Sequence, residues 1–83
     1  MWEDGSVEID GRTYYYEAKV YDLPSKYGIF KGRVSKLYVT PYEDDDFEIN
    51  YDRGWITPGI RKNEKYRRIV EAIVAKYPNP GKK

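Results

Sequence analysis

The fold is decided by the stretch Ser6-Val7-Glu8-Ile9-Asp10-Gly11-Arg12, which continues as Thr13-Tyr14-Tyr15-Tyr16-Glu17-Ala18-Lys19-Val20-Tyr21-Asp22. Polar and apolar residues alternate in both runs, and an Asp-Gly pair between two such runs is the strongest short-range signal for a β-hairpin. We therefore predict strands at about residues 6–9 and 12–22. A two-residue turn at Asp10-Gly11 places Val7 opposite Tyr14 in this pair.

The hairpin is expected to have one apolar face and one mixed face, because successive side chains of a strand point to opposite sides. The apolar face carries Val7, Ile9, Tyr14, Tyr16, Ala18 and Val20. The mixed face shows Tyr15, Glu17, Lys19 and Tyr21. The apolar face needs a cover, which a later element of the chain has to supply.

Two further strands follow a loop. Leu23-Pro24-Ser25-Lys26-Tyr27-Gly28 breaks the alternation, and we predict the third strand at about residues 33–40, ended by Pro41. After the acidic run 43–46, the alternating residues Phe47, Ile49 and Tyr51 predict a fourth strand. Asp52-Arg53-Gly54 then forms a turn in which Gly54 is available for a positive φ angle.

The C-terminal part of the chain has the period of an amphipathic helix. Apolar residues recur at i, i+3, i+4, i+7, i+8 and i+11, namely at Tyr66, Ile69, Val70, Ile73, Val74 and Tyr77. Asn63 suits the N-cap, and Pro78 and Pro80 stop the helix. The predicted fold is α+β, an antiparallel β-meander of about four strands with one C-terminal helix packed on one face. We assign residues 1–78 to this single domain and 79–83 to a flexible tail.

The composition excludes most catalytic chemistry. The chain of 83 residues contains no Cys and no His, so the thiolate nucleophile, the usual metal ligand and the usual neutral-pH proton shuttle are missing. The acidic run Glu43-Asp44-Asp45-Asp46 does not fit a calcium-binding loop. With Asp44 at position 1, the sixth residue is Ile49 and the twelfth is Trp55. We predict that the protein is not an enzyme and that it holds no cofactor and no metal.

The sequence also gives an expectation about location. Its apolar stretches are only a few residues long, and the chain starts with the acidic segment Met1-Trp2-Glu3-Asp4. We therefore expect a cytoplasmic protein with no membrane association.

Charge is distributed unevenly along the chain. Residues 1–60 carry 7 Lys/Arg against 12 Asp/Glu, whereas residues 61–83 carry 8 against 2. The basic cluster at the predicted helix start consists of Arg61, Lys62, Lys65, Arg67 and Arg68. Free N–H groups at a helix start, together with these cations, suit a phosphate of nucleic acid or a nucleotide. We favour the alternative, in which the first three cations pair with the acidic run 43–46 and the last two pair along the helix with Glu64 and Glu71.

The mixed sheet face is a second candidate for nucleic-acid binding. Its aromatic and basic side chains are Tyr15, Lys19, Tyr21, Lys36 and Tyr38. Aromatic rings that stack on bases, beside cations that follow the backbone, are typical of single-stranded nucleic-acid platforms. Glu17 and the acidic balance of residues 1–60 speak against this function. Cross-strand aromatic pairs also stabilise a sheet without any ligand, and we favour that structural interpretation.

The segment that leaves the fourth strand is a candidate for protein binding. Asp52 can cap the amides of the turn, and Trp55 can close the end of the core. A Trp beside an Arg is also typical of a protein-binding hot spot. We predict a protein-binding corner formed by Asp52, Arg53 and Trp55, and a structural role for Trp55 is compatible with it.

Four pieces of the chain carry a resemblance to other proteins. They are Ala18-Lys19-Val20-Tyr21-Asp22, Ser25-Lys26-Tyr27-Gly28-Ile29 followed by Gly32-Arg33-Val34-Ser35-Lys36-Leu37, Asn50-Tyr51-Asp52-Arg53-Gly54-Trp55, and the closing helix. In these pieces the chain resembles a family of small uncharacterised domains of bacteria and their phages, over nearly its whole length. The resemblance implies a fold and a phage-like setting, without an activity.

The function expected from the sequence is that of a small non-enzymatic binding module. Small phage proteins of this size often bind host machinery, and by this analogy we expect a phage-derived module that engages a host protein partner, for example as an inhibitor of a defence system. The alternative is a nucleic-acid-binding domain that uses the basic cluster and the sheet tyrosines. An exposed edge strand allows either a monomer or a dimer paired through that edge.

Overall fold

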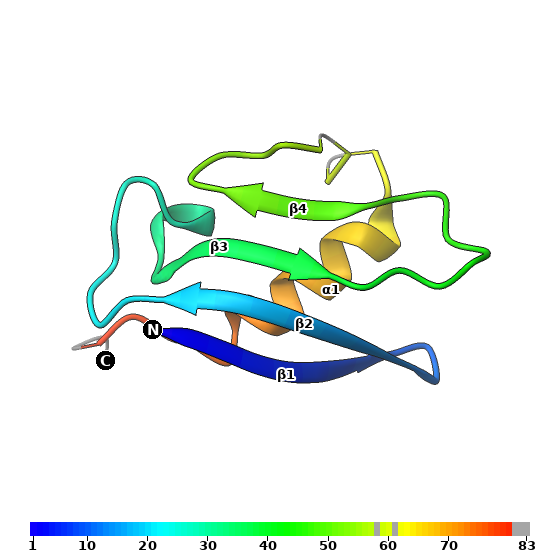
Figure 1. Ribbon diagram of the computed structural model, residues 1–83, viewed down its shortest axis with the longest axis horizontal. Helices are drawn as coiled ribbons and strands as arrows, with labels where there is room; N and C mark the ends of the chain where they lie inside the picture. Colours follow the sequence, from blue (N-terminus) through cyan, green and yellow to red (C-terminus); the bar gives the residue numbers. More distant parts are fainter. Residues whose placement is uncertain (58, 61, 81–83) are drawn as a thin grey trace.

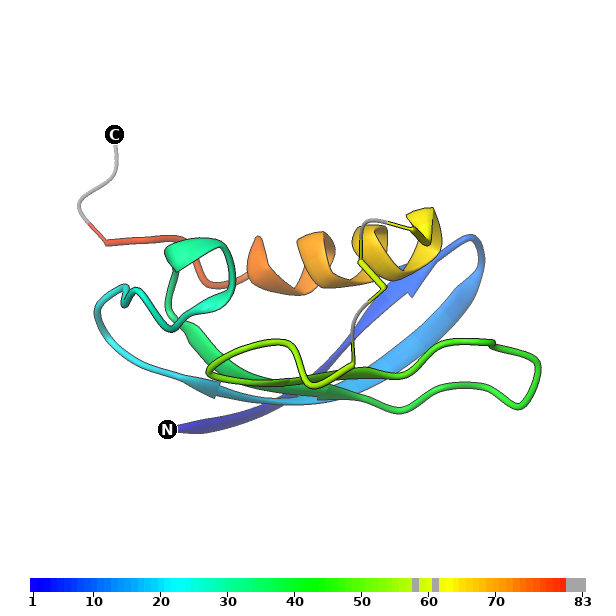
Figure 2. The same cartoon turned by 90° about the horizontal axis from the view of Figure 1, so that it is seen from above.

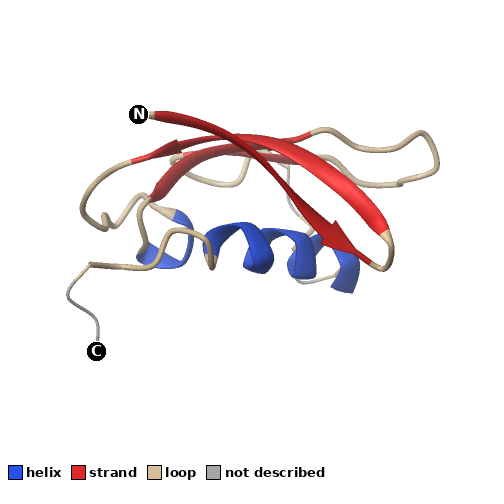
Figure 3. Cartoon of the chain, turned by 90° about the horizontal axis from the view of Figure 1, so that it is seen from below, coloured by secondary structure: helices blue, strands red, loops and turns tan. Residues whose placement is uncertain are grey.

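The computed structural model describes residues 1–57, 59–60 and 62–80, and it confirms the α+β class. The elements are, in chain order, β1 (Trp2–Ile9), β2 (Arg12–Val20), the short 3₁₀ helix η1 (Ile29–Lys31), β3 (Val34–Val39), β4 (Ile49–Asp52) and α1 (Glu64–Val74). The strands form one sheet in the order β1-β2-β3-β4, and each neighbouring pair is antiparallel. This is the predicted meander, with α1 across one of its faces (Figure 1, Figure 3).

The turn between β1 and β2 has the predicted form. Asp10 and Gly11 have φ angles of 53° and 81°, the positive values that a type I′ hairpin turn requires at both central residues. Val7 pairs with Tyr14, as predicted. β1 begins at Trp2 rather than at about residue 6. Its first residues extend the strand because they pair with β2, although Asp4 and Gly5 have low strand propensity.

The core lies between the apolar face of the sheet and one stripe of α1 (Figure 2). The six side chains predicted to face inward from the hairpin are all buried: Val7, Ile9, Tyr14, Tyr16, Ala18 and Val20. Later strands and the helix add Val34, Leu37, Val39, Ile49, Tyr51, Tyr66, Ile69, Val70 and Ile73. Among the described residues, all of these elements cover the same side of the sheet, so its other face stays open to solvent.

Helix α1 begins as predicted and ends earlier than predicted. The Asn63 side chain accepts a hydrogen bond from the Tyr66 backbone N–H at 3.0 Å, which makes Asn63 the N-cap. The helix ends at Val74, and Tyr77 lies beyond it in a non-helical turn. The Tyr77 hydroxyl still reaches the core, because it lies 2.9 Å from the Tyr16 hydroxyl. The apolar spacing therefore identified the buried stripe but overestimated the length of the helix.

The turn after β4 places its positive φ angle on a different residue than predicted. Arg53 has a φ of 56°, whereas Gly54 does not have a positive φ. Tyr51 and Trp55 pair across this turn, and Arg53 N–H donates to the Ser35 carbonyl at 2.9 Å. This closed three-residue turn forces its middle residue into the left-handed region, so the position of the residue overrides the preference for glycine.

Candidate functional site

Helix α1 covers one face of the sheet and leaves the other face uncovered (Figure 3), and we call this second face the open face. We define it by the outward side chains of the four strands: Trp2, Asp4, Ser6 and Glu8 of β1, Thr13, Tyr15, Glu17 and Lys19 of β2, Lys36 and Tyr38 of β3, and Asn50 and Asp52 of β4. Three of its aromatic residues are strongly exposed, since Trp2 is 57% exposed, Tyr15 63% and Tyr38 40%. Exposed aromatic groups on an uncovered face are typical of interaction surfaces.

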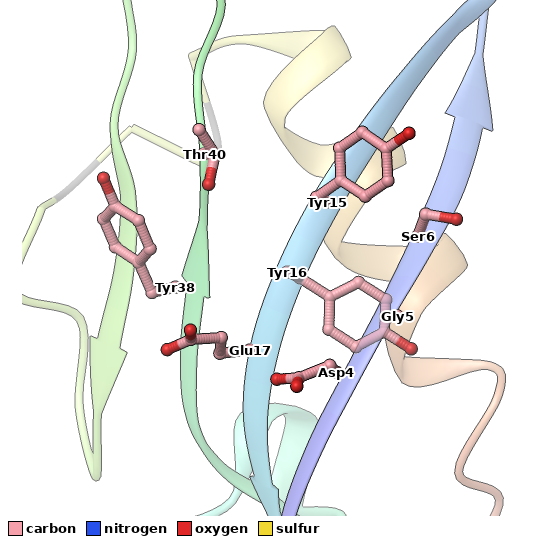
Figure 4. Close-up of a pocket in the computed structure, with 8 residues that line it drawn as sticks. All are labelled: Asp4, Gly5, Ser6, Tyr15, Tyr16, Glu17, Tyr38 and Thr40. Carbon is pink, nitrogen blue, oxygen red and sulfur yellow. The ribbon is translucent and has the colours of Figure 1, made fainter.

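A groove runs over this open face in two adjoining hollows that share Glu17 and Tyr38. The first hollow also contains Asp4 and Tyr15 (Figure 4). The second continues from it towards Trp2 and Asp52, among other residues. We call the two hollows together the open-face groove. Their lining residues come from all four strands.

One residue that lines the first hollow, Tyr16, is a buried core residue. Tyr16 is buried, and Gly5 opposite it has no side chain, so the ring lies beneath β1. Burial and the hydrogen bond with Tyr77 raise the pKa of Tyr16 well above its ordinary value. The hydroxyl of Tyr16 therefore stays protonated and gives the groove no charge of its own.

The charged groups of the groove are three carboxylates and one ammonium group, that of Lys36 in the second hollow. Asp4 lies directly opposite Glu17, and Glu17 lies opposite Tyr38. The third carboxylate, Asp52, has an oxygen 3.7 Å from Lys36 Nζ. In the part of the chain that the structure describes, Asp4 and Glu17 form no salt bridge. The open face is therefore acidic around its exposed tyrosines.

Four of the five residues of the predicted nucleic-acid platform lie together on the open face. They are Tyr15, Lys19, Lys36 and Tyr38, with Lys19 opposite Lys36 in the β2–β3 pair. Tyr21 follows the end of β2, and its ring centroid lies 5.6 Å from Lys19 Nζ. The platform thus exists as a cluster, but Asp4 and Glu17 lie within the same surface.

The basic cluster at the start of α1 is largely engaged in ion pairs within the chain. Lys65 Nζ lies 3.6 Å from Asp45, in the acidic run, and Arg67 Nε lies 3.9 Å from Glu71. Arg68 donates two hydrogen bonds of 3.1 Å to Asp10, in the hairpin turn, instead of pairing along the helix. Lys62 is exposed and lines a hollow beside Asp45 and Asp46. Arg61 lies outside the described residues.

The structure separates the members of the predicted protein-binding corner. Asp52 belongs to the open face, and Arg53 is exposed in the turn. Trp55 instead packs its ring at 4.8 Å from the Tyr51 ring and 5.8 Å from the Tyr66 ring, between centroids. These two tyrosines are buried core residues. Trp55 therefore closes the core, and its packing supports the structural role that the sequence left open.

Sequence reasoning missed two residues of the groove, Trp2 and Asp4. Both lie in the part of β1 that was not predicted as a strand. The only signal for them was weak, an alternation of Trp2, Asp4 and Ser6 that continues the mixed face of the hairpin. Without their strand, the juxtaposition of Asp4 with Glu17 had no basis in the sequence.

The described residues also bear on other classes of site. They contain no group of three or more His, Cys, Asp or Glu side chains placed to hold a metal ion. None of their helices has the length and apolar character needed to cross a membrane.

Comparison with other proteins gives a family and no activity. No curated protein and no solved structure has significant similarity to this chain. One family model does match, and it covers residues 1–78, which is nearly the whole chain. The chain therefore belongs to the family described as a domain of unknown function, DUF7678.

Proposed function

We propose that the protein is a non-enzymatic binding module that docks a protein partner on the open face of its sheet. One observation carries this proposal: Trp2, Tyr15 and Tyr38 are exposed together on a face that α1 leaves uncovered. Aromatic side chains are enriched at protein interfaces, because they bury a large area at a small loss of side-chain entropy. Asp52, which the sequence placed in a binding corner, borders the same groove.

The phage-like setting implied by the resemblance supports a host protein as the partner. A component of a defence system, inhibited by the docked module, is one such partner. This part of the proposal concerns the identity of the partner, whereas the open face concerns how the partner is bound.

The nucleic-acid alternative has weaker support. Its phosphate-binding cations Lys65 and Arg68 are paired with Asp45 and Asp10, and its sheet tyrosines stand beside Asp4 and Glu17. Carboxylates repel the phosphates that dominate affinity for nucleic acids. Fluorescence anisotropy of labelled single- and double-stranded DNA and RNA at low salt tests this alternative, and micromolar, salt-dependent binding would restore it.

The docking proposal is tested by affinity capture with three versions of the full chain. The first is wild type, and the second is Tyr15→Ser/Tyr38→Ser on the open face. The third is the control Tyr27→Ser/Phe30→Ser, which removes two aromatic residues that are 50% and 58% exposed outside the open face. Both substituted pairs are at the surface, so the thermal unfolding midpoints of the two variants should stay close to that of wild type.

The expected result is a protein retained by wild type and by the control, and lost with the open-face variant. The retained protein is then purified and titrated against the three versions. We expect the open-face variant to weaken binding by about tenfold or more, since interface aromatic residues commonly contribute more than 1 kcal/mol. A partner that binds the open-face variant as tightly as wild type would contradict the proposal.

A further inference from the structure

The open-face groove has aromatic walls and an acidic floor. Figure 4 shows the rings of Tyr15 and Tyr38 on either side of the first hollow, with Glu17 between them and Asp4 beside Glu17. The face of a tyrosine ring attracts a cation, and a carboxylate forms charge-assisted hydrogen bonds with a cationic donor. The tyrosine rings and the carboxylates therefore both favour a positively charged occupant.

The two carboxylates of the first hollow, Asp4 and Glu17, form no salt bridge within the described chain. Asp4 and Glu17 are cross-strand partners, and like charges directly opposite each other destabilise a sheet. The nearby cations on the open face are turned to other groups. Lys36 Nζ lies 3.7 Å from Asp52, and Lys19 Nζ lies over the Tyr21 ring at 5.6 Å from its centroid. A positive group placed between Asp4 and Glu17 would convert their repulsion into attraction.

We infer that the groove takes the guanidinium group of an arginine side chain presented by the protein partner. The inference rests on the proposed function, because the arginine belongs to the docked protein. A guanidinium group is planar, so it stacks on tyrosine rings, and its five N–H donors reach two carboxylates at once. A lysine ammonium group supplies the charge but not the stacking. The groove combines rings with a pair of carboxylates, and this combination matches guanidinium.

The continuation of the groove favours a peptide segment over a free cation. Beyond Glu17 and Tyr38, the second hollow reaches Trp2, which is exposed. An arginine held in the first hollow therefore places a neighbouring residue of the same segment beside Trp2. This neighbour buries apolar area against the indole ring and adds affinity that a single cation lacks.

The test uses the full ¹⁵N-labelled chain and two short peptides, N-acetylated tetra-arginine amide and tetra-lysine amide. Backbone amide shifts are followed by NMR during titration at low salt. We expect tetra-arginine to shift the amides of Asp4, Tyr15, Glu17 and Tyr38, and to bind about threefold or more tightly than tetra-lysine. Binding should weaken as salt is raised, because the groove is open to solvent.

Two variants with the same change in charge separate the groove from the charge of the whole chain. Asp4→Asn/Glu17→Gln is expected to weaken tetra-arginine binding by about tenfold or more, as the loss of close charge pairs does in other interfaces. The control Asp22→Asn/Glu43→Gln also removes two negative charges, at exposed loop residues outside the groove, and should bind as wild type does.

Any of three results of the peptide titrations would overturn the inference. They are equal affinity for the two peptides, equal weakening by the two double variants, and shifts that spread over the surface away from the groove. Shifts at the same amides that grow with protein concentration in the absence of peptide would identify a second copy of the chain as the occupant instead, and would also overturn it.

The inference and the proposed function fail in different ways. If the captured partner is lost with Tyr15→Ser/Tyr38→Ser but bound normally by Asp4→Asn/Glu17→Gln, docking on the open face stands and the arginine assignment is wrong. If the tyrosine variant binds normally, docking on this face is wrong. The partner titration with both variants therefore decides each statement separately.

Discussion

The ring of Tyr16 lies against the backbone of Gly5, its cross-strand partner in β1, and occupies the space that a side chain at Gly5 would need. A β-carbon at Gly5 would come within 2.5 Å of the Tyr16 hydroxyl oxygen and 2.6 Å of the ring carbon that bears it. The Tyr16 hydroxyl is held in place by Tyr77, 2.9 Å away. A glycine in a strand thus accommodates an aromatic ring of the neighbouring strand.

Gly5→Ala should therefore destabilise the protein, although alanine has the higher strand propensity. The added methyl group forces the Tyr16 ring away and breaks its hydrogen bond with Tyr77, and overpacking of this kind costs about 1–3 kcal/mol. The free energy of unfolding in urea measures the effect. Gly54→Ala is the control, because a β-carbon there meets no atom of the described residues within 4 Å, and we expect a change within about 0.5 kcal/mol. Equal stability of the two variants would contradict the packing of Tyr16 on Gly5.

The contact between Gly5 and Tyr16 shows why one part of the fold could be predicted from the sequence and another could not. Asp10-Gly11 and the alternation around it set the turn and the pairing of Val7 with Tyr14, because both are local signals. The first residues of β1 gave no such signal. Glycine has low strand propensity, and it suits this position because the Tyr16 ring occupies the space beside it. That contact exists only in the folded chain.

The candidate site could also be predicted only where its residues are placed by a local sequence pattern. Tyr15, Lys19, Lys36 and Tyr38 were predicted to share a face, since alternation along strands is readable from sequence. The charge of that face depends on Asp4 opposite Glu17, which requires the missed part of β1. Arg68 was predicted to pair along the helix and instead reaches Asp10, across 58 positions of sequence. Long-range ion pairs of this kind have no local signature.

Ser35 carries a buried hydroxyl whose removal should stabilise the protein. The residue is 3% exposed, and its Oγ has no hydrogen-bond partner among the described residues. A buried polar atom without a partner retains the cost of its lost hydration, so Ser35→Ala should raise the free energy of unfolding by about 1 kcal/mol. Urea denaturation checks this value.

Ser25→Ala is the matched comparison for this prediction. The Ser25 hydroxyl accepts a hydrogen bond of 3.0 Å from the Tyr27 backbone N–H, so the same substitution removes a satisfied contact in the turn. We expect a small loss of stability, about 0.5 kcal/mol. If Ser35→Ala is the more damaging of the two, the Ser35 hydroxyl has a partner that our account lacks.

Asp44 should make the stability of the protein depend on acid pH. Arg12 donates two hydrogen bonds to its carboxylate, at 2.7 and 2.8 Å, and these lower the pKa of Asp44 below its ordinary value. A carboxylate with a lowered folded-state pKa stabilises the fold above the ordinary pKa, and this contribution is lost as pH falls through the folded-state pKa. Below about pH 4, the stability due to Asp44 should therefore decline.

The measurement is the urea midpoint of wild type and Asp44→Asn between pH 2 and pH 7. We expect wild type to have the higher midpoint at pH 7, and the difference to shrink in the acid range. Glu43→Gln removes the same charge from the neighbouring exposed residue, outside the Arg12 ion pair, and should leave the midpoint nearly unchanged. A difference between wild type and Asp44→Asn that is constant with pH would show that the ion pair does not stabilise the fold.

The two tryptophans should respond to substitution in opposite ways, because they lie on opposite sides of the sheet. Trp55 packs against the buried rings of Tyr51 and Tyr66, so Trp55→Ala removes packing at the end of the core and should destabilise the protein by about 2 kcal/mol or more. Trp2 is 57% exposed on the open face, so Trp2→Ala should change stability by about 0.5 kcal/mol or less.

Each variant keeps one tryptophan as a fluorescent reporter. The indole in the Trp2→Ala variant, at the core, should emit at shorter wavelength than the exposed one in Trp55→Ala. Under the docking proposal, Trp2→Ala weakens partner binding while the fold is kept, and Trp55→Ala weakens it only as far as it unfolds the chain. A stable Trp55→Ala variant that has lost its partner would instead restore the predicted corner of Asp52, Arg53 and Trp55 as the binding site.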